Sequence, residues 1–310
     1  MLKDSFILAI LQNLPKFAEM DSIQDILKER LLLLLDDFVA ICHKYSLKYY
    51  VSDGTALGAI RHKGMIPWDD DIDILMPRED LRKLISLRDE LAADGKVYLC
   101  SPGDDNYTLP FAKFCDAHST ILQERDENNI CGIWLDIFPL DRAGGGMAGI
   151  QMKWGKWAKT WRRLQLSSSC PPLYLIAKYA FSGRFELLAD AITARVLRHW
   201  RGRCLEQYLA LEAQLDDPQG NRYVTMCDGR IYVFSKEWFG EGNEVEFEGR
   251  KVTAPAEVEK YLSFIYGDYM TPPPVEKRHS EHRFHYINFS EKVSLKQARS
   301  RARQGHHTDF

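Results

Sequence analysis

A short segment of alternating acidic and apolar residues constrains the fold of this chain more than any other feature. The segment reads DDDIDILMP and occupies residues 69–77. Alternate side chains of a β-strand lie on the same face, so the pattern predicts a strand on which Asp71 and Asp73 point the same way. The isoleucines between and after them then point into the core. The chain therefore needs a sheet in which one strand presents two adjacent carboxylates on a single face.

Two neighbouring carboxylates repel each other strongly when they are partly buried. Shared protons, basic partners or a divalent cation relieve that repulsion, and crowded carboxylate oxygens favour Mg²⁺ or Mn²⁺ over zinc. A second apolar strand, predicted over 132–141, carries a lone carboxylate at Asp136. If the two strands are neighbours, Asp136 completes a three-carboxylate site of the kind that holds metals for phosphoryl transfer. A solvated acidic loop and a calcium site are the alternatives.

The glycine-containing segment SDGTALGAIRHKG, residues 52–64, comes just before the acidic strand. We expect Gly54 to begin a turn in which backbone N–H groups approach a phosphate closely. Thr55 adds a hydroxyl group, and the N-terminus of the helix that follows favours an anion. The segment therefore predicts a phosphate-binding turn.

Positive charge lies next to this turn. Arg61, His62 and Lys63 precede the acidic strand and are candidates for substrate binding, although an exposed helix end explains the same pattern. Lys113 is a charged residue in the apolar strand predicted over 107–116. It contacts either a phosphate or one of the aspartates, and both interpretations remain open.

The rest of the pattern predicts a mixed α/β fold. Apolar residues at helical spacing within 22–49 indicate a long helix that begins at Ser22 and ends before the segment KYYVSDGT, which starts at Lys48. A second helix is expected over 78–93. Strands are expected over 49–52 and again from about 221 onward. We divide the single expected domain into N-terminal helices (1–48), a core (49–142), a basic helical insertion (147–215), a C-terminal part (221–290) and a basic, mobile tail (291–310).

The insertion differs in charge from the rest of the chain. Residues 147–203 contain eleven basic and two acidic residues, although the whole chain has a net charge of −3. Trp154, Trp157 and Trp161 are interleaved with lysines and arginines. Such a segment indicates peripheral contact with an anionic membrane, or binding of an anionic polysaccharide. A solvated helical face with its tryptophans packed inward is the alternative.

Composition excludes several classes of protein. A chain of 310 residues with 45% hydrophobic residues can bury a substantial core, and its near-neutral charge argues against a general nucleic-acid binder. The seven cysteines are scattered without a C-x-x-C motif, which indicates neither a disulfide framework nor a zinc site and fits the cytoplasm. The N-terminus does not read as a signal peptide, and no apolar stretch reaches the length of about 18 residues that a membrane span requires.

The segment YYVSDGTALGAIRHKGMIPWDDDIDILMPRED closely resembles the signature of the LicD family, which includes phosphocholine transferases and is related to the fukutin proteins. Later segments agree with it: AKFCDAHST, IWLDIFPLD, FEGRKVTAPAEVEKYL and YGDYMTPPP. The resemblance covers about 50–141 and about 231–280. This chain has SDGT where the family often has GGT, but Gly54 and Thr55 are retained.

The resemblance implies a nucleotidyltransferase-type fold with a mixed sheet flanked by helices. It implies metal-dependent transfer of a phospho-alcohol, typically phosphocholine from CDP-choline, to a hydroxyl of a cell-surface glycan such as lipopolysaccharide, capsule or teichoic acid. The family's metal ligands correspond to Asp71, Asp73 and Asp136, with Mg²⁺ or Mn²⁺ as the expected cofactor. The expected partners are a CDP-alcohol donor and a glycan or lipid-linked glycan acceptor. The expected location is the cytoplasm, and the basic insertion leaves peripheral attachment to the inner face of the cell membrane open.

In the expected mechanism, the acceptor hydroxyl attacks the phosphorus that carries the alcohol, and CMP leaves. Asp71 and Asp73 hold the metal against the diphosphate, while Asp136 binds a second metal or accepts the hydroxyl proton. Arg61, Lys63 and Lys113 neutralise the negative charge that develops on the leaving phosphate. Trp68 and Trp134 are candidates to contact a choline group, with burial in the core as the alternative.

Two other functions are compatible with the same residues. The site could transfer a nucleotide from an NTP and release pyrophosphate. The chain could instead be a catalytically inactive glycan-binding or assembly protein that kept the fold. Product identity separates the first alternative from phospho-alcohol transfer, and metal binding bears on the second.

Overall fold

The computed structural model describes residues 2–104, 107–123, 130–168, 171, 173–227, 229–280 and 282–309. Side chains are described from Ile23 onward, with the exception of Leu175. No disulfide joins any of the six described cysteines, as the sequence predicted for them, and Cys170 lies outside the described residues. Among the helices of this described part, none is both long enough and apolar enough to cross a bilayer.

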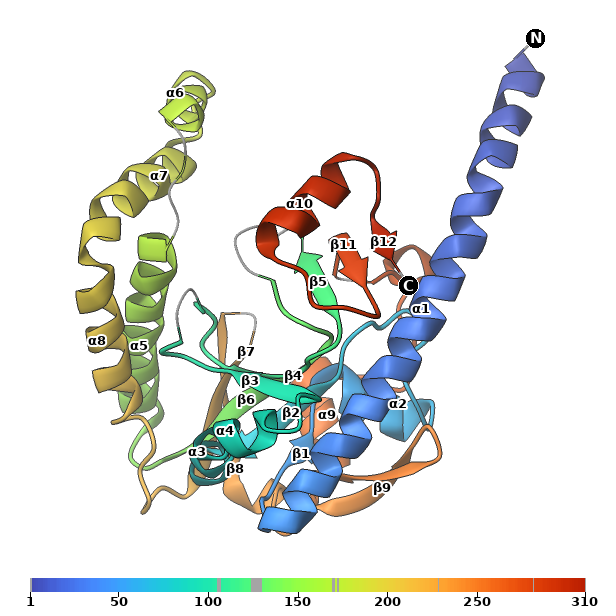
Figure 1. Ribbon diagram of the computed structural model, residues 1–310. Coiled ribbons are helices and arrows are strands. Elements are labelled where there is room, and N and C mark those ends of the chain that lie inside the picture. Colours follow the sequence, from blue (N-terminus) through green and yellow to red (C-terminus); the bar gives the residue numbers. More distant parts are fainter. Residues whose placement is uncertain are drawn as a thin grey trace.

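A mixed sheet forms the centre of the molecule, which confirms the predicted α/β class (Figure 1). Its main strands lie in the order β1-β2-β6-β4-β3, and β7 and β8 extend it from β6. β2 and β6 are parallel, whereas the other pairs are antiparallel. The strands are β1 (Tyr50–Val51), β2 (Asp73–Pro77), β3 (Val97–Cys100), β4 (Ala112–Asp116), β6 (Trp134–Ala143), β7 (Arg222–Cys227) and β8 (Arg230–Ser235).

The first helix, α1 (Leu2–Tyr45), is one continuous helix of 44 residues. It begins at Leu2, so the predicted start at Ser22 is wrong. Residues 2–45 form a single helix and not the several N-terminal helices that were expected. The helix ends at Tyr45, before the segment that begins at Lys48, as the sequence predicted, and Ser46 takes the left-handed conformation with φ of 52° where the helix stops. The predicted apolar face is confirmed, since Leu31 and Phe38 are buried in the main core. The N-terminal part of α1 projects beyond the sheet (Figure 1).

Two local predictions in the core need correction. Gly54 does not begin a turn but lies inside α2 (Asp53–Arg61), directly after β1. The helix expected over 78–93 is broken at Leu87 into α3 (Arg78–Ser86) and α4 (Arg88–Ala92). Leu87 has ψ of 2°, which lies outside the helical range, and α3 therefore ends before this residue while α4 begins after it. The strand expected over 107–116 is shorter and begins at Ala112, in β4.

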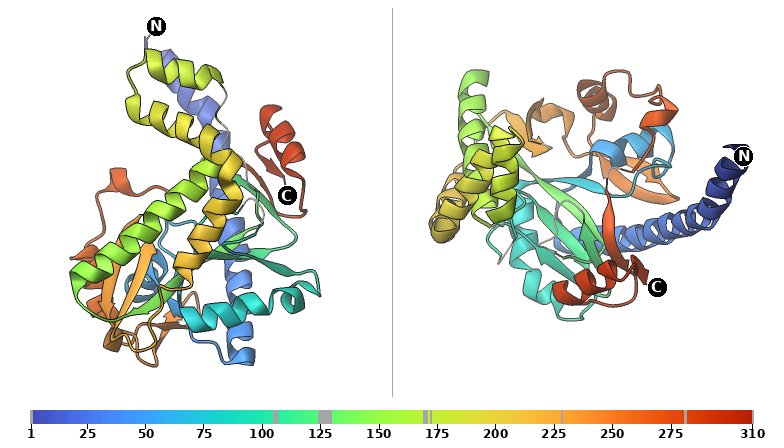
Figure 2. Two further views of the ribbon diagram at one scale, coloured as in Figure 1. Left: turned by 90° about the vertical axis from the view of Figure 1, so that its left-hand side faces the viewer. Right: turned by 90° about the horizontal axis from the view of Figure 1, so that it is seen from above.

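Residues of the predicted insertion form a helical arm at one side of the sheet (Figures 1 and 2). The arm consists of α5 (Met147–Ser168), α6 (Leu173–Phe181), α7 (Phe185–Leu197), the 3-10 helix η1 (Arg198–Trp200) and α8 (Arg201–Glu212). Trp154 and Trp157 are buried in a core of the arm's own, where Trp157 packs on Tyr208 of α8. Trp161 donates its indole N–H to the carbonyl of Thr108 at 2.7 Å. These tryptophans therefore pack inward, which is one of the two alternatives that the sequence left open.

The C-terminal part completes the molecule around the sheet. It contains β9 (Asn243–Phe247), β10 (Arg250–Ala254), α9 (Val258–Tyr266), the 3-10 helices η2 (Lys236–Trp238) and η3 (Val275–Lys277), and a small sheet of β5 (Thr120–Gln123), β11 (Phe284–Asn288) and β12 (Thr308–Asp309). The tail predicted to be mobile contains α10 (Leu295–Arg303), and the last strand pairs with β11. Ser294 and Gln297 form a capping box that starts α10, so the tail is ordered by local hydrogen bonds and strand pairing.

Candidate metal centre and active site

The register of three adjacent strands places three charged residues in one row. Asp73, the first residue of β2, lies opposite Asp136 of the parallel strand β6. Asp136 in turn lies opposite Lys113 of the antiparallel strand β4. The condition that the two acidic strands be neighbours is therefore met, and it brings together residues that are 63 positions apart in sequence.

Asp71 joins this row from the segment just before β2. The strand begins only at Asp73, so the prediction that both aspartates lie within it is wrong. Even so, one carboxylate oxygen from each of Asp71, Asp73 and Asp136 can be chosen so that all three lie within 4.8 Å of one another. Oxygen ligands at this spacing suit a hard divalent cation such as Mg²⁺ or Mn²⁺.

The electrostatics of the site show that the carboxylates are poorly compensated. Burial, followed by the charge of Asp69, raises the pKa of Asp71 well above its usual range. Burial, followed by the charge of Asp71, does the same to the pKa of Asp73. The side chain of Asp71 is still 18% exposed, so the group remains accessible from solvent. A cation bound here would stabilise the ionised carboxylates and so oppose both the burial and the repulsion that raise the two pKa values.

Lys113 partly neutralises the row. Its ammonium lies 3.0 Å from Oδ1 of Asp136, and both side chains are buried. The same ammonium lies 3.7 Å from the centre of the Trp134 ring. Of the two interpretations left open, pairing with an aspartate is therefore the one observed. A face of Trp134 is covered by this lysine, and the Arg278 guanidinium lies 5.3 Å from the centre of the Trp68 ring.

The start of α2 lies against the acidic row. The Asp73 backbone N–H donates to Oγ1 of Thr55 at 2.8 Å, so the threonine hydroxyl holds the first residue of β2. Gly54 lies against Asp69, since a Cβ at Gly54 would lie 2.5 Å from Oδ2 of Asp69 and the carboxylate would have to shift. Thr55 and Gly54 thus position the carboxylates through short contacts, and their predicted contact with a phosphate stays a prediction.

The basic residues predicted for the site occupy the other end of α2. A helix of nine residues separates its two ends by roughly 12 Å, since each residue adds about 1.5 Å. Arg61 donates to the carbonyl of Tyr269 at 2.7 Å and its Nε lies 3.4 Å from Nδ1 of His62. Lys63 is exposed and accepts a hydrogen bond at its carbonyl from the Glu248 N–H. Contact of these residues with substrate remains a prediction.

His282 belongs to the site and was missed in the sequence. Its Nδ1 lies 2.9 Å from Oδ1 of Asp70 and 3.9 Å from Oδ2 of Asp71, while Ser280 donates to the other oxygen of Asp70. Burial lowers the pKa of His282, but the hydrogen bond with Asp70 and the charge of Asp71 outweigh it and raise the pKa to about 9. The available signal was the segment RHSEHRFHY (278–286), which holds three histidines.

Without metal, the acidic cluster is expected to lose stability as pH rises. Burial raises the pKa of Asp69 to about 6 in the folded protein, whereas an unfolded aspartate titrates near about 3.9. The folded state therefore binds this proton more tightly, and the resulting stabilisation is complete below about pH 4 and lost as pH rises through about 6. We expect the melting temperature of the wild type in EDTA to fall relative to that of Asp69→Asn across this range. A difference between the two proteins that does not change with pH would contradict this.

Fold and site together define the chain as a mixed α/β protein in which three carboxylates meet at the edge of the parallel strand pair. Residues 46–173 match the family model described as LicD/FKTN/FKRP, nucleotidyltransferase domain. The chain is 30% identical over 266 residues to the lipopolysaccharide cholinephosphotransferase LicD of Haemophilus influenzae, which covers 81% of this chain and 92% of that protein. The chain therefore belongs to the LicD family, as its sequence predicted, and this membership implies a transferase.

Shorter matches occur in two other bacteria. An uncharacterised protein of Rickettsia prowazekii is 47% identical over 47 residues, which is 15% of this chain and 18% of that protein. An uncharacterised protein of Rickettsia typhi is likewise 47% identical over 47 residues, or 15% of each chain. A match of 47 residues is too short to include the core, the arm and the C-terminal part of the chain together.

Proposed function

We propose that this protein transfers a phospho-alcohol from a CDP-alcohol, with CDP-choline as the first donor to test, to a hydroxyl of a cell-surface glycan. The observation that carries the proposal is the joining of Asp71, Asp73 and Asp136 into one cluster of carboxylate oxygens. The relative from Haemophilus influenzae is named as a lipopolysaccharide cholinephosphotransferase, which supports lipopolysaccharide as the acceptor class. The donor and the acceptor are proposals for this chain.

Asp71, Asp73 and Asp136 fit a divalent cation because they supply oxygen ligands whose mutual repulsion is otherwise relieved only in part. Bound there, Mg²⁺ or Mn²⁺ would supply positive charge against the diphosphate of the donor. Lys113 holds Asp136 in place through their 3.0 Å ion pair. His282 holds the neighbouring Asp70, so that the segment preceding β2 keeps its position beside the site.

The reaction breaks one P–O bond and forms another. The acceptor hydroxyl attacks the phosphorus that bears the alcohol, its proton passes to a carboxylate oxygen of Asp136, and CMP carries away the bonding electron pair. Asp136 is the candidate for this role because it lies at the edge of the carboxylate cluster, and its ion pair with Lys113 fixes the position of the carboxylate. The N-terminus of α2 supplies backbone N–H groups that favour a phosphate oxygen.

Nucleotidyl transfer from an NTP is the second candidate, because the matching family model is described as a nucleotidyltransferase domain. The two reactions differ in the phosphorus that is attacked and in the leaving group. CMP is the expected product of phospho-alcohol transfer, and pyrophosphate is the expected product of nucleotidyl transfer. An inactive binding protein would release neither.

A ligand screen with product analysis tests these functions. CDP-choline, CDP-ribitol, CDP-glycerol and NTPs are each added with Mg²⁺, with Mn²⁺ or with EDTA, and the melting temperature is recorded. We expect one CDP-alcohol to raise the melting temperature by a few degrees only with metal, because a ligand that binds the folded state stabilises it by mass action. We also expect CMP release on addition of a lipopolysaccharide acceptor.

The variant Asp73→Asn is the matched control for this screen. It keeps the size of the side chain but removes one ligand oxygen's charge, so the metal-dependent shift should disappear. A shift with an NTP together with pyrophosphate release would instead establish nucleotidyl transfer. No shift with any donor would favour the inactive binding protein.

A further inference from the structure

Helix α6 is apolar but is not buried. It reads LYLIAKYAF, in which Lys178 is the only charged residue. Among its described side chains none is buried, and Phe181 at its end is 93% exposed. A large apolar side chain costs roughly 1.5–3 kcal/mol when it is left in water instead of being buried. A helix of this composition therefore indicates a surface that is covered by something other than water.

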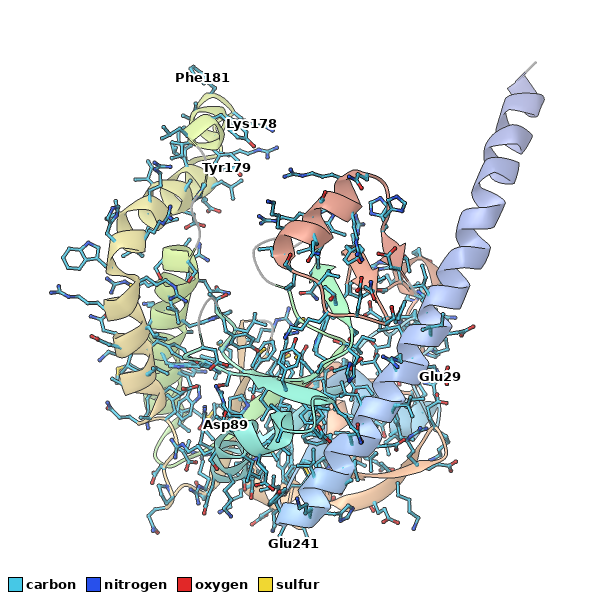
Figure 3. All side chains as sticks on the ribbon, viewed as in Figure 1. Glu29, Asp89, Lys178, Tyr179, Phe181 and Glu241 are labelled. Carbon is cyan, nitrogen blue, oxygen red and sulfur yellow. The ribbon has the colours of Figure 1, made fainter. Side chains whose placement is uncertain are left out.

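The exposed apolar surface continues into α7. Phe185, the first residue of that helix, is 71% exposed, and only Ala191 and Ala194 among the residues of α7 are buried. We call the following residues the arm-tip surface: Leu173, Tyr174, Lys178, Phe181, Arg184 and Phe185. Figure 3 shows Lys178, Tyr179 and Phe181 at the far end of the arm, away from the sheet.

The charge of this region selects among possible occupants. Residues 173–203 contain six basic and two acidic residues. One of the acidic residues, Asp190, is already paired with Arg162 of α5 at 2.8 Å. A second copy of the chain that docked through the same surface would bring like charge to it, and a soluble anionic polysaccharide offers no continuous apolar layer for Phe181 and Phe185. An anionic bilayer offers both negative headgroups and an apolar layer directly beneath them.

We propose that the arm-tip surface docks on a bilayer that contains anionic phospholipid. Phe181 and Phe185 enter the boundary between headgroups and acyl chains, and Lys178 and Arg184 contact headgroup phosphates. The helices lie on the bilayer and do not cross it. This inference rests on the exposed surface and its charge, and it is independent of the proposed reaction.

Helix α10 is a second basic element that could contact the same anionic bilayer. Helix α10 carries Lys296, Arg299, Arg301 and Arg303, and it lies on the same side of the central sheet as the arm tip (Figures 1 and 2). Lys296 is exposed, whereas Arg301 is paired with Glu291 and Asp309. Membrane contact of the arm would therefore bring a further positively charged helix toward the same anionic surface.

Co-sedimentation with vesicles tests the proposal. The full chain is mixed with vesicles of equal parts phosphatidylglycerol and phosphatidylcholine, and with vesicles of phosphatidylcholine alone. We expect binding to the anionic vesicles and at least about tenfold weaker binding to the neutral ones, since each basic side chain near the surface contributes about 1 kcal/mol. The variant Phe181→Ser/Phe185→Ser should weaken binding to the anionic vesicles by at least about tenfold.

Matched controls separate this surface from general stickiness. Met152→Ser/Val275→Ser removes two other exposed apolar side chains and should leave vesicle binding unchanged. Equal melting temperatures of all variants establish that they are folded. Asp73→Asn should bind vesicles like the wild type, so a failure of this proposal is distinguishable from a failure of the proposed reaction.

Three results would overturn the proposal. The first is that the Phe181→Ser/Phe185→Ser variant binds anionic vesicles as well as the wild type. The second is that the chain does not bind vesicles but forms dimers that this variant abolishes, which would assign the surface to a second copy. The third is that it binds a soluble anionic polysaccharide, such as heparin, but not vesicles.

Discussion

Replacement of Asp73 by Asn is expected to lower the turnover of a CDP-alcohol by at least about a hundredfold, and Asp71→Asn should do the same. Each substitution keeps the side-chain shape and removes one negative charge from a cluster whose oxygens lie within 4.8 Å. Charge stabilisation by a bound metal contributes several kcal/mol to a phosphoryl transfer, and about 1.4 kcal/mol corresponds to a factor of ten in rate. Steady-state release of CMP at saturating Mg²⁺ is the measurement.

The first control for this prediction makes the same Asp→Asn substitution outside the carboxylate cluster. Asp94→Asn changes an exposed aspartate whose side chain is 59% exposed in the loop after α4, and turnover should stay within about twofold of the wild type. Metal-free Asp73→Asn should also be at least as stable as the wild type, because the substitution removes repulsion from Asp71. Near-normal turnover in both Asp71→Asn and Asp73→Asn would refute the assignment of the metal centre.

Replacement of Arg78 by Met is expected to lower the free energy of unfolding by about 3–5 kcal/mol. Arg78 makes a bidentate contact with Asp141 at 2.7 and 2.9 Å, and both side chains are buried. It also contacts Glu212 at 3.1 Å, so one guanidinium joins α3, β6 and the last helix of the arm. Removing it leaves Asp141 as an uncompensated buried charge, which is why the expected loss is large. Urea denaturation followed by circular dichroism measures it.

Two further variants test the reason for this loss. Lys251→Met breaks a solvent-exposed pair with Glu244 and should change the stability by less than about 1 kcal/mol. Arg78→Met/Asp141→Leu removes both charges and should recover most of the stability lost in Arg78→Met, because the buried unpaired carboxylate is gone. If the double variant were as unstable as the single one, packing around Arg78 would be the cause instead of charge.

Much of the fold could be predicted from local patterns. The alternation around Asp73 predicted a strand, and the apolar run around Asp136 predicted another, and both exist as β2 and β6. The family signature was also recognisable, because it lies in one continuous segment of 32 residues. Element boundaries were less accurate. Gly54 was expected to start a turn, since glycine favours turns, but here it lies inside α2, against Asp69.

The arm shows why a local pattern was insufficient. Interleaved tryptophans and lysines on α5 indicated a membrane-facing helix equally well as an inward-packed one. The structure has Trp154 and Trp157 buried against α8, a helix that begins more than forty residues further along the chain. The apolar surface that remains exposed is on α6 and α7 instead. Which face of an amphipathic helix is covered depends on its partners, and the sequence of one helix does not identify them.

By itself, the sequence determined which residue types stand where: carboxylates alternating with isoleucines, a glycine and a threonine before them, and a family signature that spans both. Those features depend on the two-residue repeat of a strand and on neighbours along the chain. Only the tertiary structure decided that Asp73 lies opposite Asp136, that Asp136 faces Lys113, and that His282 arrives beside Asp70 from 212 positions away. Strand register and loop closure depend on long-range packing, because they minimise the free energy of the whole core and not that of one segment.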